Sequence, residues 1–161
     1  MSSMHTVDEI IIHADPAAIY RAAAEIERWP AILPHYRWVI ITAGSGNRRW
    51  VEMAARRGRI PVKWASEQWL DPSTYRIYYH HIAGITKGMT VVWSIEPRDN
   101  AVHVSIIHRL TLYYPLIRSR FGQWIIGRFF VKPIAGQTLR QLKSYLEEQA
   151  CAEQSSPDSD P

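Results

Sequence analysis

ADPAAIYRAAAEIERWPAILPHY, residues 14–36, is the stretch that decides the fold, because it separates two apolar, strand-like runs. These runs are EIIIH at residues 9–13 and YRWVII at residues 36–41. Asp15 is a suitable N-cap, and Pro16 occupies the first helical position, where its missing N–H loses no partner. A helix therefore follows, and two later prolines stiffen a short helical turn before the next strand. We expect these two helices to bridge one end of a sheet.

The rest of the first two-thirds of the chain has the pattern of a sheet. Apolar and polar residues alternate in runs that end at Gly, Pro, Asn or Asp. The predicted strands are Thr6–His13, Tyr36–Thr42, Arg49–Arg57, Ile60–Leu70, Tyr75–Ile82, Met89–Glu96 and Val102–Tyr113. The short linkers between the last six indicate antiparallel pairing, because parallel strands need longer crossovers.

The apolar period becomes helical over residues 116–149, and we expect Pro133 to kink this helix. Residues 150–161 are polar and contain two prolines, which predicts a disordered tail. We also expect residues 1–5 to be disordered. The sequence thus predicts one α+β domain over residues 6–149. In it, a seven-stranded antiparallel sheet curls around the long C-terminal helix and leaves a cavity beneath that helix.

Composition narrows the classes of function. The chain has 161 residues, a formal net charge of +4 and a pI near 9.4. This charge is too diffuse to indicate a nucleic-acid partner. Cys151 is the one cysteine, so no disulfide framework is expected, and neither a signal peptide nor a membrane span is visible. We therefore expect a cytoplasmic protein.

Several short strings resemble one family. Residues 25–30 (EIERWP), followed by Leu33 and Tyr36, resemble the D-x-E-x-W-P…Y segment of the START-like, Bet v 1-like superfamily. The similarity is to its polyketide cyclase/dehydrase group, which includes aromatase/cyclases, with coenzyme Q-binding proteins as relatives. Further matching positions are Trp64, Ala65, Ser66, Asp71, Pro72, Gly84, Met89 and Trp93. The resemblance covers about residues 6–149 and implies a helix-grip fold with a deep apolar pocket under the C-terminal helix.

The resemblance also implies site residues. Tyr36, Trp64, Ser66 and Trp93 match pocket positions of the family. The arginine that aromatase/cyclases are thought to use, two residues after the serine, is Gln68 here. A glutamine amide is neutral and cannot stabilise a developing enolate as a guanidinium does. This difference lowers the cyclase activity that we expect while leaving the pocket in place.

Strand alternation supports the same pocket. It places Trp64, Ser66 and Gln68 on one face of their strand, and Met89 and Trp93 on one face of another. Such a mixture of aromatic and polar groups suits a ligand site, although it also occurs in plain core. The residues predicted to bind ligand are Tyr36, Trp64, Ser66, Gln68, Tyr79, Met89, Trp93, His108 and Trp124.

No catalytic residue, metal or cofactor is predicted. The seven histidines show no metal-binding spacing, and adjacent His80 and His81 point to opposite faces of a strand. His108 or His80 is the general base to consider if the pocket is catalytic, but a histidine without a visible partner is more often only solvated or hydrogen-bonded. No nucleophile or phosphate-binding motif is present.

The basic, aromatic segment 117–132 has more apolar surface than one core-facing stripe requires. It suits a lid over the pocket, a peripheral contact with a membrane, or a homodimer contact. The leading hypothesis for the whole chain is a protein that binds a hydrophobic small molecule such as a lipid, isoprenoid, quinone or polyketide. The alternatives are a polyketide aromatase/cyclase that uses Tyr36 and a histidine, and a chaperone that delivers a lipid or quinone to a membrane.

Overall fold

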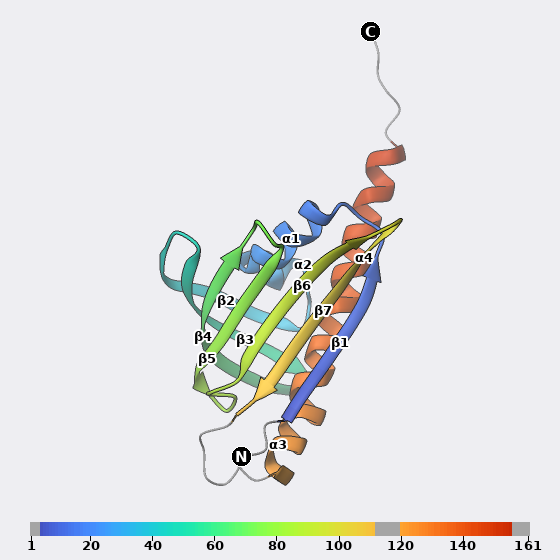
Figure 1. The fold of residues 1–161 in the computed structure, drawn as a ribbon. Coiled ribbons are helices and arrows are strands. Elements are labelled where there is room, and N and C mark those ends of the chain that lie inside the picture. The colour runs from blue at the N-terminus through green and yellow to red at the C-terminus, as the bar shows by residue number, and fades with distance from the viewer. Residues whose placement is uncertain (1–3, 112–119, 156–161) are drawn as a thin grey trace.

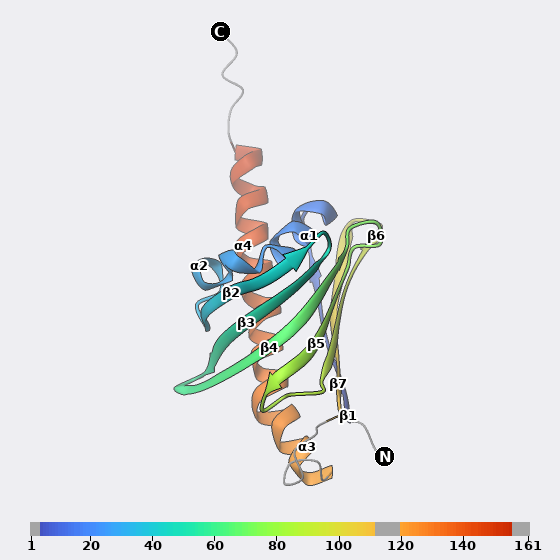
Figure 2. The same ribbon diagram turned by 90° about the vertical axis from the view of Figure 1, so that its left-hand side faces the viewer.

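The computed structural model describes residues 4–111 and 120–155, which form one curved antiparallel sheet wrapped around a long C-terminal helix (Figures 1 and 2). The strands are β1 (Met4–Ile12), β2 (Tyr36–Ser45), β3 (Arg48–Arg57), β4 (Ile60–Asp71), β5 (Arg76–Gly84), β6 (Thr90–Arg98) and β7 (Ala101–Leu110). Their order in the sheet is β1-β7-β6-β5-β4-β3-β2, and every neighbouring pair is antiparallel. The predicted helix-grip fold is confirmed.

The deciding stretch folds as expected. It forms α1 (Pro16–Ala24), the 3-10 turn η1 (Ile26–Arg28) and α2 (Trp29–Ile32), which close one end of the sheet (Figure 1). The Asp15 carboxylate accepts a 3.0 Å hydrogen bond from the backbone N–H of Ala18, so it caps α1 as predicted. These helices fix the point at which the chain enters β2.

The C-terminal helix is longer and less regular than predicted. It consists of α3 (Arg120–Ile126), the π-helical segment η2 (Gly127–Val131) and α4 (Lys132–Ser155). The π-helical turn ends at Val131, two residues before Pro133, whose nitrogen has no hydrogen to donate to the carbonyl of Phe129. The expected irregularity at the proline is therefore a change of helical register. None of the described helices combines the length and apolar character needed to span a bilayer.

The predicted domain ends need correction. Met4 and His5 belong to β1 and pair with β7, so the expected disordered start is wrong for these two residues. α4 continues to Ser155, so the predicted tail is wrong for residues 150–155. Residues 150–155 are polar, but they extend a helix that is already formed and packed on the core, and extending a helix costs much less than nucleating one. Residues 1–3, 112–119 and 156–161 lie outside the described part of the chain.

α4 is held against the concave face of the sheet by packing and by polar contacts to β1. Its fully or nearly fully buried residues include Leu139, Leu142 and Leu146, each of which contributes about 1.5–3 kcal/mol through burial. The Lys143 ammonium donates to the backbone carbonyl of Ile11 at 2.6 Å. Because the helix is anchored at this edge strand, the region between its N-terminal half and the middle strands remains less completely filled.

Gly84 allows β4 and β5 to approach each other closely where their register shifts. It pairs with Trp64, one step beyond the irregularity between Ala65 and Ser66. Its φ of +94° lies in the left-handed region that favours glycine. A Cβ at this position would lie 2.5 Å from the backbone oxygen of Lys63. The end of β5, and with it the wall of the cavity, therefore depends on this glycine.

We expect Gly84→Ala to lower the free energy of unfolding by about 3 kcal/mol or more, because it adds a backbone clash to an unfavourable φ. Gly46→Ala is a matched control, since Gly46 also has a positive φ of +58° but nothing within 4 Å of its added Cβ. That variant should lose only about 1 kcal/mol. Urea denaturation of both variants tests the difference, and equal losses would contradict the close approach at Gly84.

Candidate functional site: a cavity under the C-terminal helix

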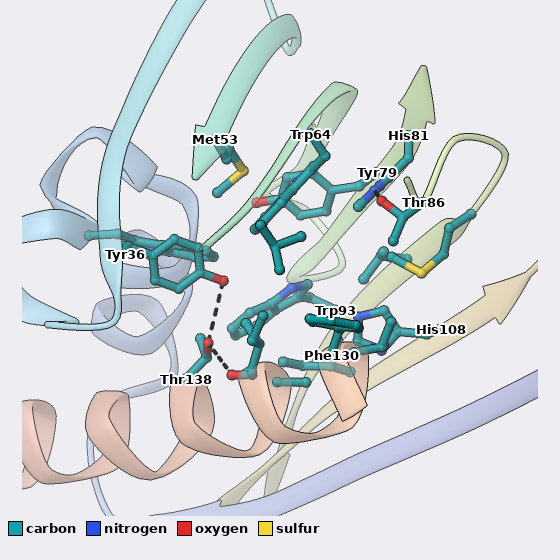
Figure 3. Close-up of a pocket in the computed structure, with 18 residues that line it drawn as sticks. Tyr36, Met53, Trp64, Tyr79, His81, Thr86, Trp93, His108, Phe130 and Thr138 are labelled. Carbon is teal, nitrogen blue, oxygen red and sulfur yellow. Dashed lines mark hydrogen bonds between the residues drawn. The ribbon is translucent and has the colours of Figure 1, made fainter. Parts of the chain in front are cut away.

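A cavity of about 80 Å³ lies between the concave face of the sheet and the η2–α4 helix (Figure 3). Strands β2 to β7 contribute to its walls, and Phe130, Val131 and Ile134 close it from the helix side. Six of the predicted ligand-binding residues line it: Tyr36, Trp64, Tyr79, Met89, Trp93 and His108. The structure brings these residues together, and their binding of a ligand stays a prediction.

Three predicted site residues do not line the cavity. Ser66 and Gln68 lie on the predicted face of β4 and are fully buried, but their side chains pack in the core beyond the cavity. Trp124 is 46% exposed and lies on α3, away from the cavity wall. The π-helical turn shifts the inward stripe of the helix, and Phe130 faces the cavity instead. The prediction of pocket lining is therefore wrong for Ser66, Gln68 and Trp124.

Sequence reasoning missed several lining residues, among them Thr138, Phe130, Thr86 and His81. His81 is the histidine of β5 that faces the cavity, whereas His80 is absent from the lining, so the choice of His80 was wrong. Strand alternation from Tyr79 contained the required signal, because residues two apart share a face. No comparable signal existed for Phe130, whose direction depends on the π-helical turn.

Tyr36 presents a phenol to the cavity next to Thr138. The Thr138 hydroxyl donates to the Ile134 carbonyl at 2.8 Å, which uses its one proton. It therefore accepts from Nε2 of His35, 2.8 Å away, and lies 3.4 Å from the Tyr36 hydroxyl (Figure 3). Burial raises the pKa of Tyr36 to about 12 and lowers the pKa of His35 to about 4. The phenol thus stays protonated and able to donate to a ligand.

A second phenol is oriented by a chain of hydrogen bonds from Arg49. The Arg49 Nε–H donates to Oε1 of Gln68 at 2.7 Å, and Nε2 of Gln68 donates to the Tyr79 hydroxyl at 2.8 Å. A guanidinium only donates, so it fixes the orientation of the Gln68 amide. The Tyr79 oxygen is then an acceptor from Gln68, and its own proton is available to another partner. Burial also raises the pKa of Tyr79.

Although position 68 holds a glutamine, a guanidinium lies beside it on the neighbouring strand. Arg49 pairs with Gln68 in the β3–β4 register, and its side chain is 16% exposed. It also donates to the Ala24 carbonyl at 2.6 Å and contacts Glu27 at 3.3 Å. These contacts hold the charge outside the cavity, from which Gln68 and Tyr79 separate it.

Two neutral histidines, His81 and His108, add further polar groups to the cavity wall. The His81 ring stacks on Trp64 with 5.8 Å between centroids, and its Nδ1 lies 2.7 Å from the Thr86 hydroxyl. Nδ1 of His108 is buried without a partner among the described residues. Burial lowers the pKa of both imidazoles to about 3. In the described part of the chain no group of three or more His, Cys, Asp or Glu could hold a metal ion.

The model of one protein family, described as polyketide cyclase/dehydrase and lipid transport, matches residues 12–142. This match spans most of the chain and includes every residue that lines the cavity. The chain belongs to the polyketide cyclase/dehydrase and lipid transport family. A search of curated proteins finds no match.

Solved structures show the fold of this family in proteins of low sequence identity. The aromatase/cyclase Zhui from a Streptomyces species has a TM-score of 0.81 at 14% identity, over 92% of this chain and 96% of that one. A protein from Thermus thermophilus has a TM-score of 0.71 at 23% identity, over 95% and 100%. A START superfamily protein from Mycobacterium smegmatis has a TM-score of 0.71 at 13% identity, over 90% and 98%. The shared helix-grip fold is the conclusion at such identities.

Within the polyketide cyclase/dehydrase fold of this chain, the neutral His108 has a measurable consequence. Its pKa is 6.5 in an unfolded chain and about 3 when buried, so only the unfolded chain binds this proton as the pH falls between these values. Stability contributed by the neutral form is complete above pH 6.5 and is lost progressively towards pH 3. His108→Gln should therefore reduce the pH dependence of the unfolding free energy in this window by about 1.4 kcal/mol per pH unit.

Urea denaturation of the parent and His108→Gln at several pH values between 6.5 and 4.5 measures this slope. The comparison uses slopes rather than absolute stabilities, so a general loss of packing in the variant does not affect it. Equal slopes in the two proteins would contradict a buried, neutral His108.

Proposed function

We propose that this protein binds an uncharged hydrophobic small molecule in the cavity under α4. The observation that carries the proposal is the lining of the cavity, in which the described residues supply mainly aromatic and aliphatic side chains and no Asp, Glu, Lys or Arg. Apolar burial drives binding in such a site, at about 25 cal/mol per Å² of apolar surface removed from water. Membership of a family whose description includes lipid transport supports this class of ligand.

The polar groups of the cavity define what such a ligand carries. The protonated phenols of Tyr36 and Tyr79 are suited to donate hydrogen bonds to a carbonyl or ether oxygen. His108 has a buried nitrogen without a partner, which suits a ligand hydroxyl or carbonyl. An apolar molecule with a few oxygen atoms, such as a quinone, isoprenoid or polyketide, satisfies both sets of groups.

The size of the cavity adds a condition. Pockets that enclose drug-sized ligands measure roughly 300–1,000 Å³, whereas this cavity measures about 80 Å³. A larger ligand therefore enters only when part of the wall moves. Phe130 is the wall residue best placed to move, because it is only partly buried and belongs to the π-helical turn.

Replacement of Phe130 by Ala should open the cavity and increase affinity for a neutral apolar fluorophore such as N-phenyl-1-naphthylamine. We expect binding at least about tenfold tighter, because the energy needed to displace the ring no longer reduces affinity. Phe129→Ala is the matched control, since Phe129 is 39% exposed and absent from the cavity lining. Fluorescence titration of lipid-stripped protein measures both variants.

Absence of saturable binding in the parent and in Phe130→Ala would overturn the proposed function. A mass spectrum of the organic extract of protein purified without detergent identifies the natural ligand class. Circular dichroism shows whether each variant remains folded.

The alternative function is polyketide cyclisation, and the protonated phenols that face the cavity favour it over other reactions. Such groups can donate to a developing enolate. A base is also required, however, and histidines with a pKa of about 3 are weak proton acceptors. We therefore favour binding over catalysis.

Exchanging Arg49 of β3 and Gln68 of β4 distinguishes ligand binding from polyketide cyclisation. Gln68→Arg alone should lower the free energy of unfolding by about 3 kcal/mol or more, because it buries a second guanidinium beside Arg49. The double variant Arg49→Gln/Gln68→Arg keeps one charge at this pair of positions and should recover most of that loss. A binding protein shows no turnover of a poly-β-ketone in the parent or in the double variant.

Turnover by the parent, with a rate or product that changes in the double variant, would instead establish cyclase activity. The cytoplasmic location and the homodimer suggested by the sequence stay predictions. The predicted membrane contact of residues 117–132 concerns their exposed side chains and not Phe130 and Val131, which line the cavity, while residues 117–119 lie outside the described part of the chain.

A further inference from the structure

The loops and helix at one end of the sheet form a continuous surface, which we call the basic end. In both views the β3–β4 turn, the β5–β6 loop and α3 lie at the end away from α1 (Figures 1 and 2). Strand pairing brings these segments together, since Trp64 pairs with Gly84 and Thr90 pairs with Arg109. The basic end consists of the described residues in the ranges 4–8, 56–63, 82–90, 108–111 and 120–132.

Charge is distributed unequally between this end and the rest of the protein. Residues 56–63 alone contain four arginines or lysines, and Lys87, Arg109, Arg128 and Lys132 add to them. Within the ranges of the basic end, Asp8 is the single acidic residue, and it lies 3.8 Å from Lys132. The chain as a whole has a net charge of only +4. Its positive charge is therefore concentrated at the basic end, and the rest of the sequence is acidic on balance.

Exposed apolar side chains gather at the same end. Among the described residues, eight large hydrophobic side chains are exposed, and all except Ile11 and Ile40 belong to the basic end. They include Ile60 at 49%, Trp124 at 46% and Phe129 at 39% exposure. Isolated exposed hydrophobic residues are ordinary, but a group of them within a positively charged surface marks an interaction site.

We propose that the basic end docks on the surface of a membrane that contains anionic lipids. Basic residues attract anionic head groups, and Trp, Phe and Ile insert at the boundary between head groups and acyl chains. A hollow beside the basic end is lined by Arg57, Arg128, Lys132 and Arg140 and by one carboxylate, that of Asp8. Its four cations exceed this single negative charge, so the hollow suits the phosphate of one head group.

The aromatic residues favour a membrane over a nucleic acid. The Arg57 guanidinium lies 5.2 Å from the centre of the Phe129 ring, and Arg128 lies 5.8 Å from the Trp124 ring. One face of each ring is thus already occupied by a cation and is not open for stacking on a base. The exposed isoleucines have no role in contacts with a phosphate backbone, whereas in a membrane they are buried.

This inference goes beyond the proposed ligand binding and does not depend on it. It rests on exposed side chains of the basic end that do not line the cavity. The residues tested below lie outside the cavity lining. Failure of vesicle binding would leave fluorophore binding unaffected, and the reverse also holds.

Co-sedimentation with vesicles tests the proposal. The full-length protein should bind vesicles of equal parts phosphatidylcholine and phosphatidylglycerol. It should bind much more weakly to vesicles of phosphatidylcholine alone. Arg59→Glu/Lys87→Glu should weaken binding by about 30-fold or more, because each basic residue near an anionic surface contributes about fivefold. Arg21→Glu/Arg76→Glu is the control, since it makes the same change of net charge with exposed residues of the opposite end. That variant should bind like the parent.

Phe129→Ser tests the apolar contribution and should weaken binding at high salt, where the electrostatic attraction is screened. Equal binding to neutral and anionic vesicles, or equal losses in the two charge variants, would overturn the proposal. So would retention of the protein by double-stranded DNA without any binding to vesicles. A stable dimer in solution that the Arg59→Glu/Lys87→Glu variant disrupts would assign the surface to a second copy of the chain instead.

Discussion

A straight helix cannot contact a curved sheet along its whole length, and this constraint shapes the rest of the protein. α4 is anchored at β1, where Lys143 binds the carbonyl of Ile11, and its leucines fill the core beside this strand. Towards its N-terminus the helix diverges from the middle strands, and the remaining space is the cavity. The position of the site thus follows from where the helix is attached, and not from any motif within the cavity.

Burial has a second effect, which is to remove charge from the site. The imidazoles that face the cavity are neutral, the phenols are protonated, and Arg49 is kept outside by its contacts with α1 and Gln68. Every polar group in the cavity therefore acts through hydrogen bonds alone. Such groups are suited to hydrogen-bond the oxygen atoms of an apolar molecule, whereas imidazoles with a pKa of about 3 are weak bases for proton abstraction.

The sequence predicted the fold well because the relevant signals are local. Period-two alternation, turn residues and the Asp15–Pro16 helix start each depend on neighbours within a few residues. The errors concern features set by distant contacts. Trp124 was placed in the cavity because the helical period was continued through η2, and the Arg49–Gln68–Tyr79 chain depends on the register of three strands. Neither the extra residue of a π-helical turn nor cross-strand register is visible in a local pattern.

The two neighbouring phenylalanines of η2 point in different directions, since Phe130 lines the cavity and Phe129 lies on the outer surface. Because they are consecutive residues of one short segment, a rotation that withdraws Phe130 also displaces Phe129. If the cavity takes up the proposed ligand and the outer surface attaches to the proposed membrane, the two binding events become thermodynamically linked, although each can occur without the other. If attachment to the membrane changes the affinity for the ligand by a certain factor, then the bound ligand changes the affinity for the membrane by the same factor. The π-helical turn thus contributes both to the cavity wall and to the exposed basic surface.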